Sequence, residues 1–325
     1  MLSLQRSFAA GTVALIATLA LSAVSTAAET WPQRSVRLIV TLGPGSGVDI
    51  GTRLLADRLA ARWGQPVVVE NRPGGDGVVA ITAMISANDD HVLLSSPSSS
   101  FTAHPFVFKN PPYKPSDLEA IARVSNTIIV IAVPATLEAK SVKDLVAMAR
   151  AEPGKLNWAG TTGAIDFLFA GFLKNAGVTM SRVPYRNQVE AMNDLATGRI
   201  QVNETAYAIA RPQVQAGKVK LLAVTNGARA SMLPDLPTAT EAGYPDLALD
   251  GLVGLFGPPS MPLALRERVA ADVREVMHDP VVTERLELTG QVPNFGGPKE
   301  FQDAIDAQGG RVGAAAKALG TVPTQ

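Results

Sequence analysis

Short runs of β-branched and aliphatic residues alternate with longer stretches of helical periodicity, and this alternation restricts the fold more than any other feature of the sequence. The runs that predict strands span residues 36–40, 65–70, 92–95, 156–158, 179–184, 199–203 and 221–225. The stretches that predict helices span residues 48–63, 78–86, 141–151, 166–176, 189–197, 262–277 and 298–319. Strands that alternate with helices in this way predict an α/β fold, in which parallel sheets are covered by helices.

Two extended apolar segments without helical periodicity predict crossings between two lobes. They span residues 122–134 and 250–259. Two crossings imply that one lobe contains both ends of the chain and the other contains its middle. We therefore predict a first lobe of residues 29–127 plus 251–325 and a second lobe of residues 128–250, with a hinge that closes on a ligand.

The N-terminus has the layout of a secretory signal peptide. Arg6 precedes an apolar run at residues 12–24, and the small residues 25–28 follow it. Cleavage after residue 27 or 28 removes a signal peptide of residues 1–28. A membrane anchor is the alternative, but the run is shorter than the ~20 apolar residues that span a bilayer. The sequence therefore predicts export, and we expect a periplasmic protein.

The composition excludes several kinds of site. The chain has no cysteine, which excludes disulfides, zinc–thiolate sites, a thiol nucleophile and a lipid-modified N-terminal cysteine. The three histidines, His91, His104 and His278, lack the spacing of metal ligands. Lys plus Arg and Asp plus Glu number 29 each, and this neutrality predicts no nucleic-acid partner. No spacing of Ser, His or acidic residues predicts a nucleophile–base pair, so we expect neither an enzyme nor a cofactor.

A glycine-rich loop at residues 43–47 lies between the first predicted strand and a helix that contains Asp49. Glycines let the backbone approach a ligand closely, and a helix start offers free N–H groups to an anion. Ser46 and Asp49 also fit a capping box, with Asp in place of the usual Glu or Gln. The loop alone leaves anion binding and helix capping equally open.

The same loop fits a dinucleotide site poorly. Glu70 ends the second predicted strand, where such sites place a ribose-binding acid. The glycines, however, form G-x-G-x-G instead of G-x-G-x-x-G, and Pro44 removes a backbone donor. We therefore expect no nicotinamide or nucleotide binding.

The middle of the chain repeats the arrangement of strand, loop and helix. Residues 158–164 read WAGTTGA and precede the helix predicted at 166–176. Thr161 and Thr162 offer hydroxyl groups, and Gly163 permits a close approach. Two facing helix starts would hold an anionic ligand from both sides, and a capped loop without a ligand is the alternative.

Many segments after the signal peptide form a recognisable series in their order and spacing. They include WPQRSVRLIV, GPGSGVDIGTRLLADRL, GQPVVVENRPGGDG, KSVKDLVAMARAEPGKLNWA, RVPYR, LPDLPTATEAGYP and GLFGPPSMP. This series resembles the Bug/TctC family, the extracytoplasmic solute receptors of tripartite tricarboxylate transporters. The resemblance implies a type II periplasmic-binding-protein fold, with two lobes, a hinge and a central ligand cleft. It also implies a carboxylate ligand held through backbone amides, hydroxyl groups and waters.

The resemblance implies ligand-binding residues in both lobes. In the first lobe they are Leu42, Gly43, Pro44, Gly45, Ser46, Asp49 and Ser96. In the second lobe they are Gly160, Thr161, Thr162, Gly163, Asp166, Tyr185, Asn187, Asn203 and Glu204. The family pattern Phe-x-Pro-Gly-Gly-x-x-Asp differs here at Leu42, Gly43 and Ser46. The Gly-Gly that usually follows the Pro-Tyr turn is replaced by residues 186–188.

Asp166 stands where many members of the family carry a small hydroxyl residue. Its carboxylate at a helix start complements the helix dipole, an effect of ~0.3–1 kcal/mol. If it faces the cleft instead, it disfavours a second ligand carboxylate and favours a ligand amine or hydroxyl. That hypothesis predicts a preference for a monocarboxylate, or for a ligand with a donor group, over citrate.

The resemblance implies a monomeric receptor that captures a small organic acid and delivers it to the membrane permease subunits of a transporter. A ligand-sensing accessory protein for a membrane signalling system is the alternative, because the same fold serves both. An exported enzyme is a third and more distant possibility.

Overall fold

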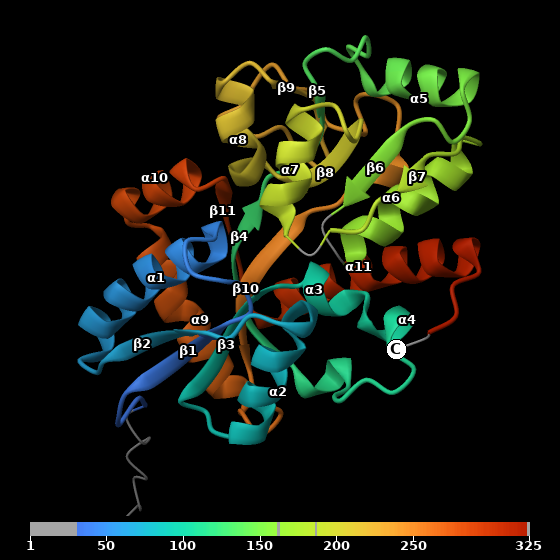
Figure 1. Ribbon diagram of the computed structural model, residues 1–325. Helices are drawn as coiled ribbons and strands as arrows, with labels where there is room; N and C mark the ends of the chain where they lie inside the picture. Colours follow the sequence, from blue (N-terminus) through green and yellow to red (C-terminus); the bar gives the residue numbers. More distant parts are fainter. Residues whose placement is uncertain (1–30, 161–162, 186, 324–325) are drawn as a thin grey trace, which may run out of the picture. The chain divides into compact units, whose positions relative to one another are not determined.

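Two β-sheets, each flanked by helices, form the framework of the chain (Figure 1). The computed structural model describes residues 31–160, 163–185 and 187–323, and Arg34–Gln325 make up one compact unit. The predicted signal peptide lies outside the described residues. In that described part, every helix is too short or too polar to cross a bilayer.

The first sheet takes its strands from both ends of the chain. Its order is β11 (Gln291–Gly296), β4 (Glu119–Thr127), β10 (Gly251–Gly257), β3 (Val92–Pro97), β1 (Val36–Val40) and β2 (Val67–Asn71). Strand β1 is parallel to β2 and β3, whereas β10 is antiparallel to β3 and β4. In this sheet the prediction of parallel pairing is therefore correct for β1, β2 and β3 and wrong for β10, which enters the sheet from the opposite direction.

Helices and short 3₁₀ turns cover the first sheet. They are α1 (Gly47–Trp63), η1 (Gly75–Gly77), α2 (Val78–Ala87), α3 (Ser99–Thr102), α4 (His104–Val107), η2 (Pro115–Asp117), α9 (Leu263–Met277), α10 (Pro280–Leu288) and α11 (Pro298–Leu319). The core contains an aromatic stack in which Phe256 packs on Phe101 and Phe301. These fully buried rings hold α3 and α11 on β10, and each contributes about 2–3 kcal/mol through burial.

The second sheet takes its strands from the middle of the chain. Its order is β7 (Ser181–Arg182), β6 (Asn157–Gly160), β8 (Val202–Ala206), β5 (Ile129–Pro134) and β9 (Val219–Val224). Its helices are α5 (Val142–Ala151), α6 (Ala164–Asn175), α7 (Gln188–Ala196) and α8 (Tyr207–Gln215), with the short turn η3 (Pro245–Leu247). Strand β6 is parallel to β7 and β8, so the carboxyl ends of β6 and β8 meet at one edge.

The passages between the two sheets are shorter than predicted. The segment predicted as one crossing at 122–134 is two strands, because β4 and β5 belong to different sheets and only Ile128 separates them. The segment at 250–259 is mostly β10, so the second passage comes before it, between β9 and β10. Asn226 joins the two passages: its Oδ1 accepts from the Ile129 N–H at 2.9 Å and its Nδ2 donates to the Thr127 carbonyl at 2.9 Å.

Helix α11 contacts elements of both sheets and lies beside α6 (Figure 1). Its Phe301 is buried in the core of the first sheet, whereas Val312 packs against Ile165 and Leu168 of α6. Gln308, between them, accepts hydrogen bonds from Ser98 and Thr102 and donates to the Asp250 carbonyl. The C-terminal helix is therefore a third link between the two halves of the unit.

Besides the short helices α3 and α4 and the 3₁₀ turns, three elements escaped the sequence prediction. Strand β11 reads QVPNFG, and its proline and glycine hide the strand pattern. Helix α8 contains Pro212, which usually breaks a helix, and α10 is short with a weakly periodic pattern. All three are held by tertiary contacts that local sequence does not report.

Candidate functional site

The carboxyl ends of β6 and β8 meet the start of α6, and this junction gathers several predicted site residues. Gly160, the last residue of β6, pairs with Glu204 of β8. Gly163 precedes α6 with φ 62°, a conformation that favours glycine. Thr161 and Thr162, also predicted here, lie outside the described residues.

Elements from the first-sheet half approach this junction closely. A Cβ on Gly163 would lie 2.4 Å from the Ser99 carbonyl oxygen and 3.3 Å from Asp76 Oδ2. Only glycine fits such a gap without a shift of the backbone. The start of α6 therefore faces α3 and η1, and the two halves of the unit meet at this point.

The turn that carries Asp76 is a site element that the sequence prediction missed. Gly74, Gly75, Asp76 and Gly77 have successive φ values of 132°, 56°, 54° and 95°. Asp tolerates this left-handed region better than most residues, although it is still unusual. The string Gly-Gly-Asp-Gly was the available signal, since three glycines around one acid indicate a turn that presents a carboxylate.

A buried histidine stands beside this turn. His104 Nε2 lies 3.8 Å from Asp76 Oδ2, and its Nδ1 lies 2.5 Å from the hydroxyl of Tyr113. Burial, together with the charge of Asp76, raises the pKa of Tyr113, so this phenol stays protonated. The Tyr113 hydroxyl thus fixes the ring of His104 with Nε2 directed toward Asp76.

A cavity of about 550 Å³ opens at the junction, a volume in the range of small-molecule sites. It is lined by Gly75, Asp76, Val107, Phe108, Trp158, Gly163, Asp166, Phe167, Ala170, Arg182 and Leu319. Its walls are apolar and aromatic, and its charged groups are two aspartates and one arginine. Residues from both sheet systems contribute to it.

Asp166 lies in the first turn of α6 and forms an ion pair with Arg182 of β7. Arg182 Nε donates to Asp166 Oδ2 at 3.0 Å, and a second guanidinium nitrogen contacts the same oxygen. Burial raises the pKa of Asp166 and Asp76 adds to this, although Arg182 opposes both. Asp166 Oδ1 is buried and, among the described residues, accepts no hydrogen bond.

Glu204 is fully buried next to this aspartate, since its exposed fraction is 0%. Burial and the charge of Asp166 raise the pKa of Glu204 well above its usual range. Neither of its carboxyl oxygens has a hydrogen-bond partner in the described part of the chain. Buried polar groups are usually paired, so an unpaired buried acid calls for an explanation.

Other polar atoms without partners belong to residues of β8 or of elements that reach its end, although the side chains of Asn203 and Thr205 point to the opposite face of the strand from Glu204. Within the described ranges, partners are also lacking for both amide atoms of Asn203, for Thr205 Oγ1, for Gln188 Oε1 and for His104 Nε2. Gln188 does donate through its Nε2 to the Gly160 carbonyl at 3.2 Å. Each such atom costs roughly 1–3 kcal/mol when it is left unsatisfied. The unpaired oxygens of Asp166 and Glu204, both beside Gly160, mark this junction as the candidate ligand site.

The glycine-rich loop of the first half has the geometry of a helix cap. The Asp49 N–H donates to Ser46 Oγ at 3.2 Å, and the Gly45 N–H donates to Asp49 Oδ2 at 2.9 Å. Burial alone would raise the pKa of Asp49, but hydrogen bonds from Arg53, Gly45 and Asn71 hold it below its usual value. Leu42 packs against Val40 and Val48. None of the predicted residues 42–49 lines the 550 Å³ cavity.

Three more predicted residues are engaged in local contacts. Ser96 is fully buried and hydrogen-bonds to Thr41 at 3.1 Å. The Tyr185 hydroxyl donates to Asp194 Oδ2 at 2.7 Å, and burial together with that neighbour raises the pKa of Tyr185 to about 12. Asn187 caps α7 by accepting from the Val189 N–H at 2.9 Å.

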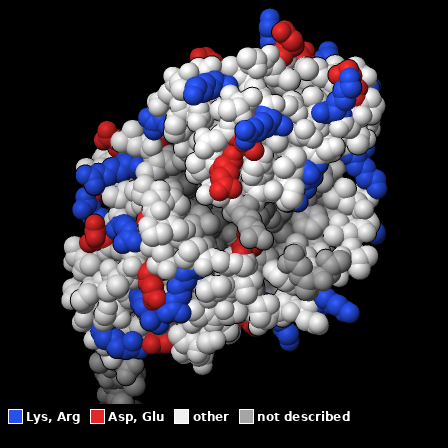
Figure 2. Space-filling view, viewed as in Figure 1, with Lys and Arg blue, Asp and Glu red and all other residues white. Residues whose placement is uncertain are grey.

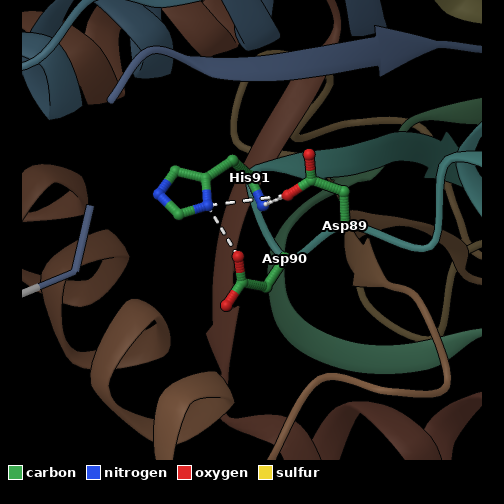
Figure 3. Close-up of side chains that lie close together, drawn as sticks. All are labelled: Asp89, Asp90 and His91. Atoms are coloured by element: carbon green, nitrogen blue, oxygen red, sulfur yellow. Dashed lines mark hydrogen bonds and ion pairs between the residues drawn. The ribbon is translucent and has the colours of Figure 1, made fainter. Parts of the chain in front are cut away.

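Two other features lie outside the junction: a group of three possible metal ligands and a second cavity. Asp89, Asp90 and His91 form a group with the geometry of metal ligands (Figure 3). Asp89 is already bound by Arg34, whose Nη2 donates to both carboxylate oxygens, and by the His91 N–H, which is the pattern of a stabilised turn. A larger cavity of about 750 Å³ lies between α11, α9 and η2. Figure 2 shows charged residues of both signs dispersed over the visible face.

Known proteins are similar to this chain in sequence over most of its length. The sequence model of the family described as "Tripartite tricarboxylate transporter family receptor" matches residues 52–321. A UPF0065 protein of Bordetella bronchiseptica is 30% identical over 270 residues, covering 82% of this chain and 80% of that protein. Protein BugT of Bordetella pertussis is 27% identical over 288 residues, covering 87% and 88%.

Solved structures share the fold. A protein from R. palustris solved with adipate superposes with a TM-score of 0.80 at 27% identity, covering 90% of this chain and all of that one. The periplasmic binding protein BugD superposes with a TM-score of 0.75 at 26% identity, covering 90% and 100%. The predicted periplasmic-binding-protein fold and the predicted family are thereby confirmed.

Proposed function

Because the chain belongs to the tripartite tricarboxylate transporter receptor family, whose members are non-enzymatic periplasmic solute receptors, we propose that it captures a small organic acid in the periplasm. Its partners would be that acid and the membrane permease subunits of a transporter. The receptor would act as a monomer that is exported through residues 1–28.

The unpaired buried polar groups at the junction of β6, β8 and α6 carry this proposal. Asn203 and Glu204 are fully buried, and in the described ranges their side chains have no hydrogen-bond partner. A polar ligand would supply those hydrogen bonds and recover part of the cost of burial. The R. palustris relative with adipate supports a carboxylate as that ligand.

The proposed ligand site keeps residues from both halves of the unit. Asp166, Gly163, Gly160, Asn203 and Glu204 lie at or beside the junction. The remaining proposed residues are Leu42, Gly43, Pro44, Gly45, Ser46, Asp49, Ser96, Thr161, Thr162, Tyr185 and Asn187. Asp76 joins the proposal as a residue that lines the cavity.

We also propose that the halves are lobes that move about a hinge. The first lobe is residues 29–127 plus 251–325, and the second is residues 128–250. Two observations support this division: the strands of each sheet fall within one lobe, and only Ile128 separates β4 from β5. A link of one residue can act as a hinge by a small change in φ and ψ.

A thermal-shift screen over organic acids tests the receptor function. A ligand that binds only the native state raises the apparent stability, by about 2.7 kcal/mol at a hundred times its Kd. The panel should contain mono-, di- and tricarboxylates, hydroxy acids and amino acids, with adipate included. A rise in melting temperature that saturates with concentration would support the function, and no response to any acid of the panel would contradict it.

A further inference from the structure

The charges at the junction do not match a ligand that carries carboxylates alone. Among the described residues that line the cavity, Asp76 and Asp166 are acidic and Arg182 is basic. Glu204 adds a third acid behind them, paired in the sheet with Gly160. Arg182 is already committed to Asp166. A ligand with only carboxylates would bring further negative charge to a region where acids outnumber bases.

The unpaired atoms of these acids are hydrogen-bond acceptors. Asp166 Oδ1 and both oxygens of Glu204 are buried and accept no hydrogen bond from any described residue. Asp166 Oδ1 lies directly over Gly160, because a Cβ there would be 2.1 Å from it. Glu204 neighbours that same glycine in the sheet, so the free oxygens of the two acids lie on the same side of one residue.

The occupant of such a place must donate hydrogen bonds. An ammonium group offers three donors and one positive charge, which complements two or three carboxyl groups. A bare metal ion fits less well, because the acids of the junction do not bring three ligand atoms within 4.8 Å of one another. Among the described residues, the group that does so is Asp89, Asp90 and His91. Acceptor atoms that lie farther apart suit an organic cation better than a metal ion.

We propose that the ligand is a carboxylate that also carries an amine, and that Glu204 and Asp166 receive this ammonium group. The inference rests on the proposed receptor function and specifies its ligand class. Glu204 then distinguishes ligands with an amine from ligands without one, because its carboxylate can pair with an ammonium group but forms no hydrogen bond with a methylene group at the same place.

Binding of the amine has a consequence for protons. Without a ligand, burial and the charge of Asp166 raise the pKa of Glu204 and favour its neutral form. An ammonium group at hydrogen-bonding distance favours the carboxylate instead. Glu204 then releases its proton to solvent when the ligand binds, while the ligand keeps its own charge. Affinity for the amino acid therefore rises with pH until Glu204 is ionised in the free protein.

Other titratable groups lie on the elements that pack against β8 or reach the junction. They are Asp166 on α6, Arg182 on β7, Asp76 and His104 from the first half, Glu190 and Asp194 on α7, and Arg211 on α8. Strands β5 and β6, which flank Glu204 directly, carry no charged residue. Because Glu204 is the fully buried acid of this group, substitution of Glu204 isolates its contribution to the proton balance.

The test is titration calorimetry with two matched series of ligands. The first series is butyrate, 2-hydroxybutyrate and 2-aminobutyrate, and the second is succinate, malate and aspartate. Each measurement is repeated in two buffers of different ionisation enthalpy, which gives the number of protons released. We expect the amine of each series to bind about ten- to a hundredfold more tightly than the unsubstituted acid, as charge-assisted hydrogen bonds typically allow, and with release of a proton.

The variant Glu204→Gln keeps the size of the side chain and removes the titration. We expect it to lose the preference for the amine and the proton release while it still binds unsubstituted acids. Glu138→Gln, at an exposed position after β5 in the same half, is the matched control and should behave as the unmutated protein. Far-ultraviolet circular dichroism and melting temperature establish that each variant folds.

The outcomes separate this inference from the receptor function. Equal affinity for succinate and aspartate without proton release would overturn the amine proposal and leave the receptor function standing. Proton uptake with a plain carboxylate would also overturn it, because the complex would then gain a proton from solvent where the amine proposal requires that Glu204 lose one. Absence of binding by every acid in both series and in the wider screen would count against the receptor function itself.

Discussion

Replacement of Asp166 by asparagine tests whether charge at the cavity wall selects the ligand. Asp166 Oδ2 is bound by Arg182, while Oδ1 has no partner in the described part of the chain. Asparagine keeps the size of the side chain and removes its charge. The substitution therefore leaves the guanidinium of Arg182 without its counter-ion beside the cavity.

The expected effect follows from the change in local charge. Asp166 and Arg182 together present no net charge to a distant group, whereas Arg182 alone presents one positive charge. A ligand carboxylate about 8 Å away would gain about 2 kcal/mol at an effective dielectric of 20. Salt, and the half-exposed position of Arg182, reduce this to about 1 kcal/mol. That corresponds to roughly fivefold tighter binding for each additional carboxylate.

The assay is calorimetry of both proteins with citrate, succinate and aspartate. We expect the unmutated protein to bind citrate most weakly, and Asp166→Asn to improve citrate more than succinate while weakening aspartate. Asp235→Asn, at an exposed position in the same half, is the control for a general loss of negative charge. Tight citrate binding by the unmutated protein, unchanged in Asp166→Asn, would leave Asp166 with the helix-dipole role alone.

Three further predictions address the cap, the buried acid and the hinge. Ser46→Ala should lower the free energy of unfolding by about 1 kcal/mol and Ser46→Gly by a few tenths; weaker ligand binding in Ser46→Gly, measured by calorimetry, would show that the hydroxyl also contacts ligand. Burial raises the pKa of Glu204, so the free energy of unfolding falls as pH rises from about 4.5 through the folded pKa. Glu204→Gln should therefore melt at a higher temperature than the unmutated protein at pH 8 and at a similar temperature at pH 4. If the two proteins have the same melting curve at pH 8 as well as at pH 4, this reasoning is wrong. Small-angle scattering should give a smaller radius of gyration with saturating ligand, and an unchanged radius would argue against a moving hinge.

Local sequence predicted the elements whose own residues determine them. Strand β1 has the predicted bounds, and the Ser46 half of the predicted capping box is confirmed by the hydrogen bond from the Asp49 N–H, although the Asp49 carboxylate accepts from the Gly45 N–H and not from that of Ser46. These features depend on side chains within four residues of one another. The family and its fold could also be predicted, because they depend on many segments in order and no single residue decides them.

The candidate site could be predicted only in part. Strand β8 was predicted at residues 199–203 and lies at Val202–Ala206. That shift moves Glu204 from beyond the strand to its interior, where it is paired on both sides by Gly160 and Ile131 and is fully buried. Glutamate is uncommon in strands, so local preference placed it outside. Pairing with neighbouring strands, which the sequence of β8 does not encode, decided otherwise.

In the proposed ligand site, burial is what would turn Glu204 and Asp166 from ordinary acids into determinants of specificity. In solution both would be ionised and hydrated at neutral pH, and neither would discriminate between ligands. At the junction their free oxygens are shielded from solvent, so each unmade hydrogen bond carries its full cost, and a ligand that makes it gains accordingly. Apolar packing by Trp158 and Phe169 keeps water from this edge of the sheet. The proposed selectivity would therefore depend on the hydrophobic core beneath the site as much as on the acids themselves.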